Sequence, residues 1–143
     1  MRNKVTVVGA GNVGATCAQR IAERLIEHPK VKKVYYPTLY DDPEQIKIRL
    51  AQCEFPGAIM TLDLLGGKPA VFQFLRSLKI ARNAVSLGGV ETLACHPMTT
   101  THSGLTPEEL KLAKIGDGLV RLSVGIEDWR DVLSDFEQAL DSI

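Results

Sequence analysis

With 143 residues, 45% of them apolar and 24% charged, the chain is long enough for one globular domain and lacks the composition of a disordered protein. Lys and Arg together equal Asp and Glu at 17 each, which excludes a nucleic-acid-binding protein and is compatible with self-association into a homo-oligomer. The apolar runs are too short for a membrane span, and the chain does not start with a signal-peptide pattern. Three widely spaced cysteines indicate a reducing compartment, so we expect a cytoplasmic protein. We also expect that the protein requires no partner.

The N-terminal segment has the pattern of a strand followed by a glycine-rich turn and a helix. The run Val5–Val8 predicts a buried strand, and the Gly-x-Gly-x-x-Gly spacing that follows lets a backbone approach a pyrophosphate at a helix N-terminus. The next predicted strand ends in Tyr36-Pro37, without the acid that would hold an adenine ribose. We therefore expect only weak, vestigial anion binding, and no useful binding of NAD. The residues predicted to make this contact are Gly9, Gly11, Asn12, Val13 and Gly14.

A single helix is predicted to continue from this turn. Val13, Cys17, Ile21 and Leu25 recur every four residues and predict one apolar stripe buried against a sheet.

The middle of the chain alternates between helix and strand patterns. Asp42-Pro43-Glu44-Gln45 predicts a capped helix start, and the helix that follows carries Ile46, Leu50 and Cys53 on one face. A strand is predicted over Ala58–Leu65 by its alternation of apolar and polar residues. The sequence then predicts a helix with Val71, Phe72 and Leu75 facing inward, and a short strand over Glu91–Cys95.

The last third repeats this alternation. Thr106-Pro107-Glu108-Glu109 predicts a capping box, Leu119–Val124 a strand, and the stripe from Trp129 to Ile143 a long final helix. The predicted fold class is α/β: a single-domain sandwich with a mixed sheet of about five strands and packed helices, beginning with a Rossmann-like βαβ unit.

Candidate catalytic and metal-ligating residues cluster around a polar loop. Cys95, His96 and His102 are possible metal ligands, but without a fourth ligand at regular spacing we interpret them as a buried cysteine and two histidines without metal. His102 and Ser103 are neighbours on a loop with no orienting carboxylate, so they do not predict a nucleophile and base. We expect no catalytic residue and no metal site.

Two family resemblances divide the chain. The string Gly9–Arg20 resembles the first βα unit of malate dehydrogenases, over residues 1–24. Residues 21–143 resemble the C-terminal small domain of the Cys/Met-metabolism enzymes that use pyridoxal phosphate (PLP), such as methionine γ-lyase and cystathionine γ-synthase. This second resemblance is carried by His28–Pro37, Ala84–Leu93, His96-Pro97 with Thr101–Ser103, and Val120–Asp128.

The second resemblance implies roles for two residues. Arg121 corresponds to the arginine that grips the substrate α-carboxylate, and Ser86 to a residue at the edge of the active site. The cofactor lysine and phosphate cup of that family lie in a large N-terminal domain, so we interpret both residues as vestigial.

The two resemblances together predict a chimera of residues 1–143, joined between Ala18 and Leu25. We expect a designed or recombined structural protein that is not an enzyme, has no native catalytic function, and binds neither NAD nor PLP productively. Two alternatives remain. One is a weak nucleotide- or phosphate-binding module at Gly9–Gly14, and the other is a truncated PLP-dependent domain of a sulfur-amino-acid enzyme.

Overall fold

The computed structural model describes residues 12–143. The elements, in chain order, are α1 (Asn12–Leu25), β1 (Val31–Tyr35), the 3-10 helix η1 (Pro37–Leu39), α2 (Pro43–Gln52), β2 (Ile59–Leu64), α3 (Gly67–Ser77), β3 (Arg82–Asn83), β4 (Leu93–Cys95), the 3-10 helix η2 (Pro97–Thr99), α4 (Pro107–Leu112), β5 (Leu119–Ser123) and α5 (Trp129–Asp141). The predicted first strand lies outside the described residues. The Rossmann-like βαβ start is therefore not confirmed.

The five strands form one mixed sheet in the order β1-β2-β5-β4-β3. Neighbouring strands are antiparallel except β3 and β4, which are parallel. This arrangement confirms the predicted α/β class and the mixed five-stranded sheet. It also places β5 at the centre, between β2 and β4.

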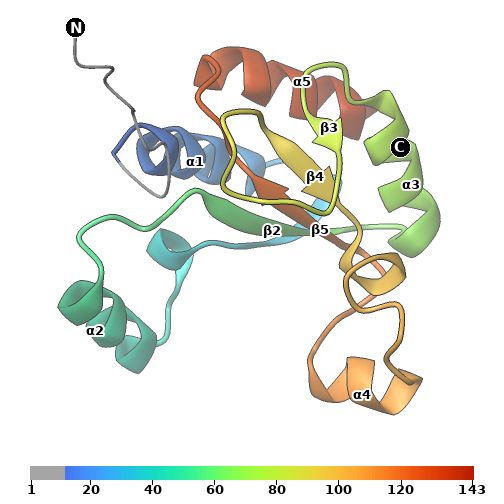
Figure 1. Ribbon diagram of the computed structural model, residues 1–143, viewed down its shortest axis with the longest axis horizontal. Coiled ribbons are helices and arrows are strands. Elements are labelled where there is room, and N and C mark those ends of the chain that lie inside the picture. The colour runs from blue at the N-terminus through green and yellow to red at the C-terminus, as the bar shows by residue number, and fades with distance from the viewer. Residues whose placement is uncertain (1–11) are drawn as a thin grey trace, which may run out of the picture.

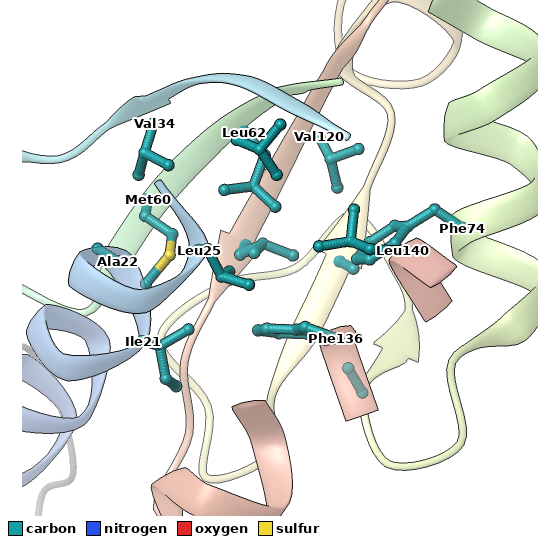
Figure 2. Packing of buried hydrophobic residues seen from close by; sticks show 14 of the residues in the cluster. Ile21, Ala22, Leu25, Val34, Met60, Leu62, Phe74, Val120, Phe136 and Leu140 are labelled. Carbon is teal, nitrogen blue, oxygen red and sulfur yellow. The ribbon is translucent and has the colours of Figure 1, made fainter. Parts of the chain in front are cut away.

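One face of the sheet carries the hydrophobic core. Successive side chains of a strand point to opposite faces, and in β5 Val120 and Leu122 belong to the core cluster whereas Arg121 does not. Helices α1, α3 and α5 cover the core face, and α2 and α4 project from the other side of the sheet (Figure 1). Figure 2 shows side chains of α1 and α5 meeting those of the strands; the residues it labels are Ile21, Ala22, Leu25, Val34, Met60, Leu62, Phe74, Val120, Phe136 and Leu140.

Helix α1 is continuous, as predicted, but its stripe is only partly buried. Ile21 and Leu25 are fully buried, Cys17 is half-buried, and Val13 is 61% exposed, so the expectation for Val13 is wrong. Because a helix has 3.6 residues per turn, a spacing of four advances about 40° around the axis at each step. The stripe therefore rotates away from the sheet toward the N-terminus, where the small Ala15 contributes buried surface instead.

The two projecting helices have the capping interactions that the sequence predicts. The Asp42 side chain accepts hydrogen bonds from the Glu44 and Gln45 N–H groups, at 2.8 and 3.1 Å. Thr106 and Glu109 form a reciprocal capping box at the start of α4. Neither helix buries a residue, and Leu50 in the apolar face predicted for α2 is 66% exposed.

Candidate functional site

Arg121 lies in the middle of β5, on the sheet face opposite the helices α1, α3 and α5. The alternation of side chains along β5 turns Arg121 away from the core that holds Val120 and Leu122. In the register of the sheet, Arg121 lies opposite Thr61 on β2 and Cys95 on β4. A cation is thus placed at the centre of the sheet, where strands on both sides fix the backbone that carries it.

The guanidinium of Arg121 is held by the loop between β3 and β4, residues 84–92, called here the 84–92 loop. Its Nη2 donates hydrogen bonds to the carbonyl oxygens of Val85 and Ser86, at 2.7 and 2.9 Å. Its Nε is buried and has no hydrogen-bond partner among the described residues. A buried donor on a charged group is costly to leave unpaired. The guanidinium is therefore held in one orientation with its Nε–H group unpaired. Such a cation can bind an anion, and a carboxylate is the acceptor that best matches a guanidinium.

The 84–92 loop is fastened to the sheet along its length. The Gly88 N–H donates to the Ser123 hydroxyl at 3.0 Å, and the Ile126 N–H donates to the Val90 carbonyl at 2.9 Å. At the start of the loop, the Ala84 N–H donates to the Ala94 carbonyl at 3.0 Å. These bonds fix the two carbonyl groups that orient Arg121.

A buried cluster at the end of the loop was not predicted from the sequence. The carboxylate of Glu127 accepts from the N–H and from the hydroxyl of Thr92, at 2.7 and 2.8 Å. The Thr92 hydroxyl in turn accepts from the Gly125 N–H at 3.0 Å, and Thr92 is fully buried. Thr92 and Glu127 are 35 positions apart in the sequence, so no local sequence pattern predicts their contact. Only the placement of Gly125–Glu127 directly after β5 hints at it.

The structure brings together the two residues whose roles the PLP-family resemblance implies. Ser86 contacts Arg121 through its backbone carbonyl. The side chain of Ser86 is exposed, so the contact depends on the path of the loop. The substrate-binding role of the pair stays a prediction.

The predicted anion site at the start of α1 is described only in part. Gly9 and Gly11 lie outside the described residues, and α1 begins at Asn12. A Cβ on Gly14 would lie 3.2 Å from the Cβ of Ala58, so Gly14 permits the close approach of α1 to the chain just before β2. This packing role is independent of any ligand, and anion binding at the turn stays a prediction.

The residues weighed as metal ligands are engaged otherwise. The Nε2 of His96 lies 3.0 Å from the Asp117 carbonyl, which can only accept, so Nε2 carries the proton and Nδ1 accepts from the Thr99 hydroxyl at 2.8 Å. Burial lowers the pKa of His96 from its ordinary value, against the hydrogen bond to Asp117, which raises it. Cys95 is buried, and His102 contacts the Thr101 hydroxyl. Within residues 12–143, no three His, Cys, Asp or Glu side chains gather as a metal site.

Comparisons with known proteins identify relatives of most of the chain. Residues 13–141 match the family described as Cys/Met metabolism PLP-dependent enzyme. An L-methionine gamma-lyase of Fusobacterium nucleatum subsp. nucleatum is 47% identical over 126 residues, which cover 88% of this chain and 32% of the relative. A cystathionine beta-lyase of Bacillus subtilis is 42% identical over 88% of this chain and 32% of its own length. The chain thus spans about a third of the curated relatives it matches.

A solved structure agrees with the sequence relatives. The crystal structure of cystathionine gamma synthase from Xanthomonas oryzae pv. oryzae, in complex with aminoacrylate and cysteine, superposes with a TM-score of 0.85. It is 41% identical and covers 91% of this chain and 33% of that chain.

These findings correct four expectations. The comparisons give no support to a malate dehydrogenase segment or to a chimeric origin, and the family match begins at residue 13, inside α1. The designed, non-catalytic protein is the wrong interpretation, because relatives at 42–47% identity are sulfur-amino-acid lyases. The expectations that the chain is not an enzyme and that no cofactor is involved are wrong for the same reason. Both expectations assumed that every catalytic group would have to lie within this chain, although the chain matches only about a third of the length of its relatives.

Among the described residues, no helix is long and apolar enough to cross a membrane.

Proposed function

The chain belongs to the Cys/Met metabolism PLP-dependent enzyme family, and on this premise we propose that it forms the part of such an enzyme that binds the carboxylate of a sulfur-containing amino acid. Its relatives include an L-methionine gamma-lyase and a cystathionine beta-lyase. The similar solved structure is a complex with aminoacrylate and cysteine, which supports an amino acid as the ligand class.

The observation that carries the proposal is the buried, unpartnered Nε of Arg121 beside an Nη2 that the 84–92 loop fixes. An α-carboxylate supplies the acceptor that this nitrogen lacks, and charge-assisted hydrogen bonds to it are stronger than neutral ones. Ser86 contributes its carbonyl, which holds the guanidinium in place before the ligand arrives. The loop orients the guanidinium before the ligand arrives, and because Nε is buried, a local shift of the loop or side chain has to expose it to the carboxylate.

Arg121 and the 84–92 loop of this chain form a site that suits the carboxylate group of an amino acid. Pyridoxal phosphate, when bound, supplies the electron sink for chemistry at the amino acid. The role we assign to this chain is to fix the carboxylate through Arg121 and thereby orient the amino acid. The 84–92 loop lies against the same guanidinium and excludes water from part of it.

Titration of the protein with L-methionine by isothermal calorimetry tests the proposal. Arg121→Gln removes the charge, and we expect it to weaken binding by about 10- to 100-fold, the equivalent of about 1.5–3 kcal/mol for hydrogen bonds to a charged group. Arg121→Lys keeps the charge but loses the planar fork, so we expect an intermediate loss. Arg82→Gln, at an exposed arginine on β3, is the matched control and is expected to bind as the unmodified protein does.

A second ligand separates carboxylate recognition from affinity for the rest of the molecule. 3-(Methylthio)propylamine lacks the carboxylate, so its binding should be weak and indifferent to Arg121. Equal affinity of the unmodified and Arg121→Gln proteins for L-methionine would refute the proposal, provided that thermal unfolding shows both to be folded.

A further inference from the structure

A cavity on the helix-covered side of the sheet belongs to none of the sites described above. It lies between α3, β3 and η2 and has a volume of about 270 Å³. Its apolar wall is formed by Phe72 and Leu75 of α3, and its polar lining includes Arg76, Asn83, His96 and Thr99. Neither Arg121 nor any residue of the 84–92 loop is among the residues that line the cavity.

The polar rim of the cavity has two side chains that no other group of the described chain satisfies. Arg76 and Asn83 are exposed, and their side chains form no hydrogen bond or ion pair with any residue of 12–143. The ammonium of Lys68 lies 5.4 Å from the centre of the Phe72 ring and adds a second positive charge near the same wall. The nearby Asp117 carboxylate faces the Lys68 backbone N–H at 3.4 Å. Arg76 is the charged side chain among the residues that line the cavity, and this positive charge attracts an anion.

The remainder of the lining is uncharged and partly apolar. Both nitrogens of His96 are hydrogen-bonded to protein atoms, so its ring contributes a neutral surface. Phe72 stands edge-on to that ring, with centroids 5.6 Å apart and an interplanar angle of 88°. Leu75 completes the wall and is buried. The cavity therefore joins a cationic rim to an apolar interior.

We propose that this cavity binds a small carboxylate with an unbranched apolar tail. The carboxylate lies at Arg76, where the Asn83 amide supplies a further donor, and the tail lies on Phe72 and Leu75. The volume equals that of about nine water molecules at ~30 Å³ each, which leaves room for a carboxylate with a short tail. This inference concerns a second site and does not depend on the role of Arg121.

The test is a titration of the ¹⁵N-labelled protein with sodium hexanoate, followed by amide shifts in two-dimensional NMR spectra. We expect saturable shifts for amides of α3 and η2, and much weaker effects from acetate, which lacks the tail, and from 1-hexanol, which lacks the charge. Arg76→Gln should weaken hexanoate binding by about tenfold or more. Asn83→Asp should also weaken it, because it adds a negative charge to the rim. Arg82→Gln, the neighbouring exposed arginine outside the lining, should change affinity by less than about twofold.

Three outcomes would overturn the proposal. One is the absence of saturable shifts at about 10 mM hexanoate, a concentration above a millimolar dissociation constant. The second is equal binding of hexanoate and 1-hexanol, which would make the cavity merely apolar. The third is a titration that moves the 84–92 loop and disappears in Arg121→Gln but persists in Arg76→Gln. That result would assign the carboxylate to Arg121 alone, supporting the proposed function while refuting this second site.

Discussion

Replacing Phe136 with alanine is expected to lower the free energy of unfolding by about 3–5 kcal/mol. Phe136 is fully buried in α5, and its ring lies against that of Phe74, with centroids 6.1 Å apart and the planes inclined at 43°. The substitution removes this ring contact between α5 and α3 and leaves a cavity that the close-packed core cannot fill.

Urea denaturation measures this change directly. Ser134→Ala, at an exposed position of the same helix, serves as the control and should alter stability by less than about 0.5 kcal/mol. A loss below about 1 kcal/mol for Phe136→Ala would mean that α5 docks loosely.

The second large effect is expected at Gly125, which follows β5 in the chain and packs against the 84–92 loop. A Cβ at this position would collide with the Val90 carbonyl oxygen and would lie 2.5 Å from Oε2 of Glu127 and 2.6 Å from the carbonyl carbon of Glu91. Backbone atoms cannot yield as the end of a flexible side chain can. Gly125→Ala must therefore displace the loop, at a cost of about 1–3 kcal/mol or more.

The displacement of the loop should also reach Arg121, since its two carbonyl partners belong to the same segment. We expect Gly125→Ala to weaken L-methionine binding together with stability, as measured by calorimetry and thermal unfolding. Gly104→Ala is the matched control, because a Cβ there meets nothing within 4 Å. If the two variants behaved alike, the loop would not be the element that orients Arg121.

The parts of the fold that were predictable from the sequence are those determined by local patterns. The alternation of Met60, Leu62 and Leu64 with polar residues predicts which face of β2 is buried, and the structure confirms it. The capping box at Thr106 and Glu109 is likewise a local signal, and its two reciprocal hydrogen bonds form as expected. Such features depend on residues within a few positions of one another, so tertiary packing need not be known.

Contacts between distant segments were not predictable from local patterns. The four-residue spacing carries the stripe around α1, and only the packing of α1 on the sheet shows that Val13 is the member left exposed. The bond between Thr92 and Glu127 depends on the packing of two loops that lie 35 positions apart. The family resemblance identified Arg121 and Ser86, but only the structure shows that Ser86 acts through its carbonyl. Loop path, not residue type, creates that contact.

The functional interpretation failed for a different reason. The Gly-x-Gly-x-x-Gly spacing is short, and Gly14 has a packing reason of its own at Ala58. The longer match across residues 13–141 identifies the family. A motif of three glycines is weaker evidence than several separate motifs, so the glycine-rich turn does not support a chimera.

The most direct test of the account is the NMR signal of the Arg121 Nε–H group during a titration with L-methionine. If Arg121 receives the carboxylate, this signal, assigned by its loss in Arg121→Lys, shifts with the same saturation curve as the calorimetric binding. The shift reports that a carboxylate has reached the buried donor that lacks a partner among the described residues. If L-methionine saturates the protein while the Arg121 Nε–H signal stays unchanged, the amino acid binds elsewhere, and Arg121 is not the group that receives its carboxylate.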